Sequence, residues 1–161
     1  MPILHTQFVA QAQKPDGTVV QLPPNVALQQ RGPIVQVNVS LEQSFAQALL
    51  AQGKTLPKAE SGFALIDTGA SHTCIDDDVA KRLNLPAIDV AMMTSASHEA
   101  TQQNVYPVQI EMIGMPISIG SARTMGANLK AQGLILLIGR DVLASVIFIY
   151  SGPAGQITFA V

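Results

Sequence analysis

An apolar segment that ends in a lone carboxylate constrains this chain more than any other feature. Residues 64–66 are apolar and run directly into Asp67, which Thr68 and Gly69 follow. Short apolar runs bounded by turn residues are typical of buried strands, and burial disfavours the charged form of a carboxylate. The sequence therefore indicates either a carboxylate with a chemical use or, as the plainer alternative, an aspartate that forms a turn or caps a helix.

The composition predicts one domain and limits the kinds of partner. The chain has 161 residues, 48% of them hydrophobic and 12% charged, with a net charge of −2. This composition argues against a disordered tail, nucleic-acid binding and a basic membrane patch. So few charges leave much apolar surface, which favours a subunit interface.

The cysteine and histidine content argues against a metal site. Cys74 is the only cysteine, so no disulfide can form within the chain. His72 and Cys74 lie two residues apart without further ligands at a convincing spacing, and we expect no metal and no cofactor. The N-terminal residues 1–6 lack a basic start and an apolar segment. Together these features favour a reducing, cytoplasmic compartment.

Hydrophobic patterning predicts a mainly β fold with a few short helices. Val35, Val37 and Val39 alternate with polar residues, as in a strand with one buried face. Further strands are expected at residues 6–12, 18–22, 62–67, 73–75, 89–93, 104–112, 115–119, 134–138, 147–150 and 156–161. Short helices are expected at residues 41–53, 79–83 and 141–145.

A second segment repeats the pattern around Asp67. Residues 136–143, like residues 64–71, join apolar residues to a glycine-containing turn and a short helix. This segment contains Gly139, Arg140 and Asp141. Asp141 lies where a helix cap is expected, so we interpret Arg140 and Asp141 as structural, in an ion pair or a cap.

Together, residues 65–70 and 137–143 resemble the two motifs of the retropepsin-like aspartic peptidases, including bacterial members. The resemblance covers most of residues 33–161. It implies a closed β-barrel or sandwich half with one or two short helices, acting as a C2 homodimer. Residues 33–161 would be the protease domain, and residues 1–32 an N-terminal β-hairpin extension.

The resemblance also implies the roles of the site residues. The Asp67 pair would bind and activate the attacking water, because two close carboxylates share one proton and supply both acid and base. Thr68 would brace the facing subunit, Gly69 would allow close approach of the backbone, and Ala70 would complete the loop.

A flap would close over an extended peptide, which is the expected substrate together with protein chains. Its candidates are Met93, Thr94, Ser95, Ala96, Ser97 and His98. Retroviral members carry an aspartate at the position of Ser71, where it pairs with the arginine that matches Arg140. The sequence therefore leaves two roles for Arg140, which would stabilise either the dimer or its own turn.

These features predict an aspartic endopeptidase. Because the Asp-Thr-Gly sequence occurs once, the hypothesis requires a homodimer whose twofold axis joins two copies of Asp67. The main alternative is a catalytically weak or inactive module of the same fold that dimerises and binds peptides. A third possibility is a domain that pairs with a different chain.

Overall fold

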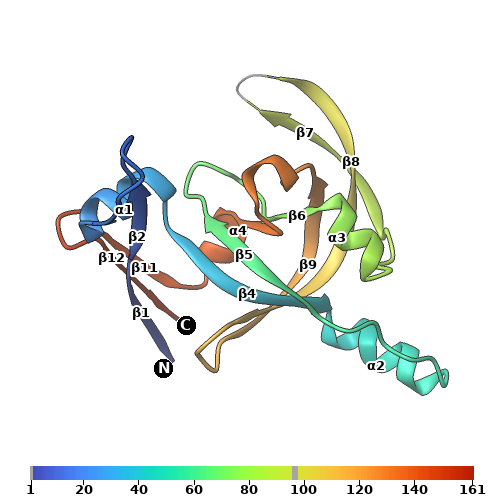
Figure 1. Ribbon diagram of the computed structural model, residues 1–161. Coiled ribbons are helices and arrows are strands. Elements are labelled where there is room, and N and C mark those ends of the chain that lie inside the picture. Colours follow the sequence, from blue (N-terminus) through green and yellow to red (C-terminus); the bar gives the residue numbers. More distant parts are fainter. Residues whose placement is uncertain (1, 96–97) are drawn as a thin grey trace.

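The computed structural model describes residues 2–95 and 98–161, and its architecture is mainly β, as predicted (Figure 1). The strands are β1 (Ile3–Gln7), β2 (Ala10–Gln13), β3 (Val19–Leu22), β4 (Ile34–Leu41), β5 (Glu60–Ile66), β6 (Cys74–Asp76), β7 (Asp89–Ser95), β8 (His98–Met112), β9 (Ser118–Ala127), β10 (Leu136–Ile138), β11 (Ile147–Ser151) and β12 (Gln156–Ala160). The helices are α1 (Pro24–Arg31), α2 (Gln43–Ala51), α3 (Asp77–Arg82) and α4 (Arg140–Leu143), with a 3-10 turn η1 (Lys130–Gln132).

A closed ring of strands forms the body of the molecule. The strands lie in the order β4, β5, β10, β6, β9 and β8, and β8 pairs back to β4. β7 pairs only with β8 and extends the sheet outward. The prediction for β4 is confirmed: Val35, Val37 and Val39 are buried, and the residues between them are more exposed.

The two motif segments end at the same place in this ring. β10 runs parallel to β5, with Ile138 opposite Ile66. The backbone N–H of Asp67 donates to the carbonyl oxygen of Ile138 at 2.9 Å. Because parallel neighbours present their carboxyl ends at one edge, the turn after each strand lies beside the other.

The N-terminal part contains more than the expected hairpin. β2 and β3 do form an antiparallel hairpin, but β1 pairs with β12 near the C terminus. Helix α1 was not among the expected elements, although Pro24 stands at its first position, where proline favours the start of a helix. Leu28 of this helix is fully buried in the main core, so residues 1–32 share that core, and the boundary at residue 33 stays a prediction.

Several expected element boundaries are wrong. The strand expected at residues 6–12 is divided between β1 and β2, and the strand expected at residues 104–112 begins at His98. The strand expected at residues 115–119 begins only at Ser118 and continues to Ala127, because a turn at Gly114, with a φ of 89°, precedes it. The helix expected at residues 41–53 is α2, which contains no buried residue and projects from the barrel (Figure 1). Its N-cap is Glu42, whose side chain accepts from the N–H groups of Ser44 and Phe45.

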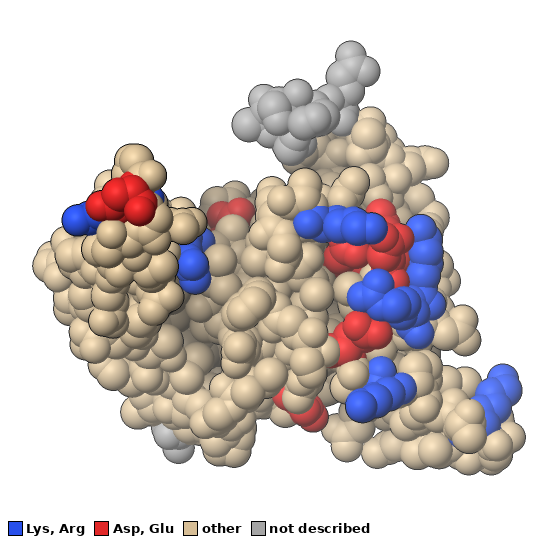
Figure 2. All heavy atoms as spheres, viewed as in Figure 1, with Lys and Arg blue, Asp and Glu red and all other residues tan. Residues whose placement is uncertain are grey.

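Charged side chains gather on one part of the face in Figure 2, over α3 and its neighbours. Arg82 pairs there with Glu60 at 3.1 Å, and Lys81 with Asp78 at 3.6 Å. Much of the remaining face in that view is uncharged. Within residues 2–95 and 98–161, no helix has the length and apolar character needed to cross a membrane.

Candidate active site

Asp67 begins a tight loop at the end of β5. Its carboxylate oxygen Oδ1 accepts a hydrogen bond from the backbone N–H of Gly69 at 2.8 Å, and its carbonyl accepts from Ala70 at 3.2 Å. The side chain of Asp67 is half-buried, and Thr68 is exposed. A Cβ at Gly69 would lie 3.0 Å from Asp67 Oδ1, so glycine lets the loop close on its own carboxylate.

Arg140 fastens this loop from the second motif. Its guanidinium Nη1 donates to the carbonyl oxygens of Thr68 at 2.8 Å and Gly69 at 3.0 Å. Nη2 donates to the hydroxyl oxygen of Ser71 at 2.9 Å, and the backbone N–H of Arg140 donates to Ala70 at 3.0 Å. The sequence left open whether Arg140 contacts the dimer partner or its own turn. The contacts seen here all lie within one chain. Ser71 thus supplies an acceptor where retroviral members carry an aspartate.

Asp141 binds Thr73 through two hydrogen bonds. Its carboxylate accepts from the backbone N–H of Thr73 at 2.9 Å and from the Thr73 hydroxyl at 2.7 Å. The same hydroxyl accepts from the N–H of Gly139 at 3.0 Å. Thr73 is fully buried and Asp141 is exposed, so the bonds between them are partly buried, and they connect the two motifs. Sequence reasoning missed Thr73, and the position of Asp141 in the first turn of α4 gave no signal for it.

Gly139 is where the two motif segments approach most closely. A Cβ there would lie 2.4 Å from the carbonyl carbon of His72 and 2.5 Å from its oxygen. Atoms of the backbone cannot yield as the end of a flexible side chain can. The glycine of the second motif is therefore required by packing against the loop that follows Asp67.

A cleft of about 780 Å³ opens beside Asp67, beneath β7. One part of its wall is apolar and rich in sulfur, and another part is polar. The apolar residues include Cys74, Met92, Met93, Met125, Leu129 and Leu137; the polar ones include Ser71, His72, Thr94, Asn128 and Gln132. A cleft of this size and mixed lining fits a segment of peptide.

The flap candidates fall on the β7–β8 hairpin. Met93 and Thr94 border the cleft, and Ser95 pairs through its backbone with His98. Ala96 and Ser97 lie outside the described residues. Residues of β7 therefore border the cleft, and the role of the hairpin as a flap stays a prediction.

A second hollow, of about 370 Å³, borders Asp67 on another side. Its lining is mainly apolar and includes two aromatic side chains from β11. The lining residues are Pro33, Leu65, Ile66, Asp67, Thr68, Phe148 and Tyr150. The sequence did not predict this hollow, because Pro33, Asp67 and β11 are far apart along the chain.

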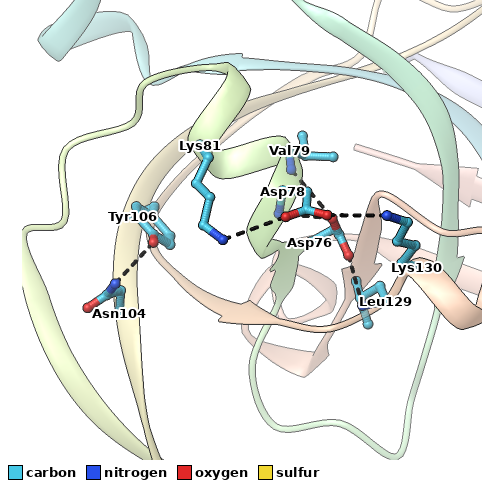
Figure 3. A network of polar contacts seen from close by, with 8 residues as sticks. All are labelled: Asp76, Asp78, Val79, Lys81, Asn104, Tyr106, Leu129 and Lys130. Carbon is cyan, nitrogen blue, oxygen red and sulfur yellow. Dashed lines mark hydrogen bonds and ion pairs between the residues drawn. The ribbon is translucent and has the colours of Figure 1, made fainter.

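Asp76 caps α3. Its Oδ1 accepts from the N–H groups of Asp78 at 3.1 Å and Val79 at 3.4 Å, and its Oδ2 accepts from Leu129 at 2.9 Å (Figure 3). Burial raises the pKa of the neighbouring Asp77. In the described part of the chain no group of three or more His, Cys, Asp or Glu side chains could hold a metal ion.

Cys74 is buried and also borders the cleft. Burial, with smaller contributions from the charges of Asp141 and Asp67, raises the pKa of its thiol to about 11. At pH 8 such a thiol is ionised in about one molecule in a thousand, against about one in four for an ordinary cysteine.

We therefore expect alkylation of Cys74 by iodoacetamide at pH 8 to be at least about a hundredfold slower in the folded protein than in urea. Mass spectrometry of timed samples measures this difference. Because the pKa is raised, the reaction should speed up as pH rises toward 11. Equal rates in the folded and unfolded protein would contradict the burial of this thiol.

The barrel, the Asp67 loop and the turn that fastens it are those of a retropepsin-like aspartic peptidase. The family model described as "gag-polyprotein putative aspartyl protease" matches residues 59–145, more than half of the chain, and the chain belongs to this family.

A solved structure of a retropepsin-like aspartic protease from Rickettsia conorii is similar over 99% of this chain and 96% of that chain, with a TM-score of 0.42 and 12% identity. No curated protein matches the chain.

Proposed function

We propose that two copies of this chain form an aspartic endopeptidase, with one Asp67 from each copy in the active site. The observation that carries the proposal is a single carboxylate, half-buried in a fastened loop, at the border of a peptide-sized cleft. Membership of an aspartyl protease family supports the same chemistry. One carboxylate cannot act as acid and base at once, so the site needs a second copy.

The reaction needs no covalent intermediate with the enzyme. The ionised Asp67 takes a proton from water as the water oxygen attacks the peptide carbonyl carbon. The other Asp67 gives its proton to the carbonyl oxygen. When the tetrahedral intermediate collapses, the C–N bond breaks and the leaving nitrogen takes a proton from one carboxyl group of the pair. A hydroxyl group of the intermediate returns its proton to the other carboxylate as the carbonyl bond re-forms, so the pair again holds one proton. Because one proton must be shared between the carboxylates, activity should be highest on the acidic side of neutrality.

Strand β11 is the surface that fits the second copy. β11 is an edge strand of the sheet β1–β12–β11. Ile147 and Ile149 are 55% and 53% exposed on one face, and Phe148 and Tyr150 border the second hollow on the other. Apolar residues on both faces of a strand are typical of a strand that is buried on both sides.

Residues 142–161 contain no charged side chain and no histidine. Exposed edge strands usually carry charges or proline that prevent pairing with other chains, and β11 has neither. Antiparallel pairing of β11 with its own copy is compatible with a twofold axis, because both copies then use the same surface. Since Asp67 borders the hollow beside β11, this pairing would carry each Asp67 toward the axis.

We expect Ile149→Lys to convert the dimer to a monomer, because the substitution places a charge on an apolar interface. Peptide cleavage should fall in parallel. The matched control is Val19→Lys on β3, where the replaced valine is 58% exposed. Analytical ultracentrifugation of both variants gives the mass, and a dimer that persists unchanged in Ile149→Lys would rule out pairing through β11.

The activity itself is tested by incubating the protein with a peptide mixture from pH 3 to pH 8 and identifying the products by mass spectrometry. We expect internal cleavage that a general inhibitor of aspartic peptidases abolishes. At low protein concentration the rate should rise more steeply than linearly with concentration, because two chains form one site. A protein that cleaves no peptide at any of these pH values would contradict the proposal.

A peptide-binding module without catalysis is the second candidate. The observation that favours it is the sequence of the flap candidate, because residues 93–100 contain no glycine, and glycine supplies mobility to a closing loop. The separation of the two Asp67 carboxylates in a crystal structure of the dimer discriminates the two functions. Carboxylates about 3 Å apart must share a proton, whereas a binding module has no need of that distance.

A further inference from the structure

We infer that His72 selects peptide substrates that carry a carboxylate next to the cleaved bond, an inference that rests on the proposed function. The uncharged polar residues of the cleft wall that lie outside the β7–β8 hairpin are Ser71, His72, Asn128 and Gln132. We call these residues the donor wall. They border the same cleft as Asp67 but take no part in the proton transfers described above.

The chemistry of the donor wall fits an acceptor. Each of its side chains carries an N–H or O–H group, and none is limited to accepting. The hydroxyl oxygen of Ser71 already accepts from Arg140 at 2.9 Å, which leaves its own hydrogen to donate. A carboxylate offers only acceptor oxygens and makes strong hydrogen bonds with such donors.

The backbone that carries His72 is held on both sides. Arg140 binds the Ser71 side chain before it, and Asp141 binds the amide and hydroxyl of Thr73 after it. Gly139 packs directly against the His72 carbonyl group. Because the backbone is already fixed, only the exposed imidazole has to be ordered when a ligand binds.

The other half of the donor wall is held by the buried carboxylate of Asp76. Asp76, which is 5% exposed, accepts from the backbone N–H of Leu129 at 2.9 Å (Figure 3). Leu129 lies next to Asn128, and its carbonyl accepts from the N–H of Gln132 at 3.0 Å. Both segments of the donor wall are thus placed before a substrate arrives.

The charge of Asp67 limits where in the cleft a substrate carboxylate would lie. Asp67 is the acidic side chain among the residues that border the cleft, and it repels a second carboxylate close to it. The substrate carboxylate therefore belongs to the side chain of a residue that flanks the cleaved bond, and it lies away from the Asp67 carboxylates. The apolar residues of the cleft, among them Met93 and Met125, would take the neighbouring apolar side chain.

The test compares peptides that differ only by Glu or Gln at each position flanking the cleaved bond. The wild-type protein should cleave one Glu peptide with a kcat/KM about tenfold above its Gln partner. His72→Ala should lower kcat/KM for the Glu peptide more than for the Gln peptide, so that the ratio of the two falls to about one, and His72→Gln should retain part of the preference. His5→Ala, which removes a histidine on β1, is the matched control.

A carboxylate can also come from the end of a chain, so each peptide is tested with a free and an amidated C terminus. If amidation does not change the preference for Glu, the donor wall binds an acidic side chain of the substrate. A preference that amidation removes, and that His72→Ala removes too, assigns it to a terminal carboxylate.

Binding measurements separate this inference from the proposed function. Fluorescence anisotropy of the same labelled peptides on the Asp67→Asn protein reports the preference without catalysis. If the wild-type protein cleaves no peptide but Asp67→Asn binds Glu peptides better, the proposed function fails and the role of His72 stands. If cleavage occurs and His72→Ala leaves the ratio of Glu to Gln unchanged, the role of His72 is wrong.

Discussion

Replacing Asp67 by asparagine is expected to reduce kcat/KM for peptide cleavage by at least about 10⁴-fold. In a homodimer the substitution removes both carboxylates at once, so neither base nor acid remains to move the protons of water and peptide. Asparagine has nearly the same shape, and its side-chain oxygen can still accept from the Gly69 N–H. The loop and the dimer should therefore survive, as measured by circular dichroism and ultracentrifugation.

The matched control for this experiment is Asp16→Asn. Asp16 is exposed in the β2–β3 turn, where its side chain accepts from the N–H of Thr18 at 2.9 Å. The same chemical change there should leave cleavage within a factor of about two, because surface substitutions are usually nearly neutral. Full activity in Asp67→Asn would overturn the assignment of the active site, whatever the dimer does.

Gly139→Ala is expected to lower the free energy of unfolding by about 3 kcal/mol or more. The added Cβ would lie 2.4 Å from the carbonyl carbon of His72 and 2.9 Å from the N–H nitrogen of Thr73. The two segments must separate to admit it, which weakens the hydrogen bonds from Thr73 to Asp141. Urea unfolding followed by circular dichroism measures the change.

Gly120→Ala gives a matched comparison. A Cβ at Gly120 would meet its nearest atom, the flexible end of Gln109, at an ordinary contact distance of 3.5 Å. This variant should lose less than about 1 kcal/mol. Equal stability losses in the two variants would show that the approach of the two motifs is looser than these distances indicate.

The sequence predicted those features whose signals are local. The valines of β4 alternate along the chain, and the apolar run before Asp67 ends in a turn that Gly69 permits. Each signal lies within a few residues, so the pattern itself defines the element. The second motif was recognised for the same reason, because Gly139 and Arg140 follow directly on an apolar strand.

The partners of those residues depend on contacts distant in sequence. Arg140 binds carbonyl groups about seventy positions earlier in the chain. Every residue has a backbone carbonyl, so the residue types do not indicate which ones act as acceptors. Thr73 looked like an ordinary strand residue until β5, β6 and β10 placed it beside Asp141. Helix α1 is different, because Pro24 at its first position is a local signal for the start of a helix.

The uncharged segment at residues 142–161 has a consequence for the conditions under which the protein works. An interface built on such strands gains its free energy from apolar burial, so added salt should screen very little of it. Hydrophobic association weakens on cooling, and a dimer joined through β11 should therefore dissociate more readily near 4 °C than at 25 °C. Cold storage of dilute samples would then yield half-sites, and rewarming would restore the catalytic pair.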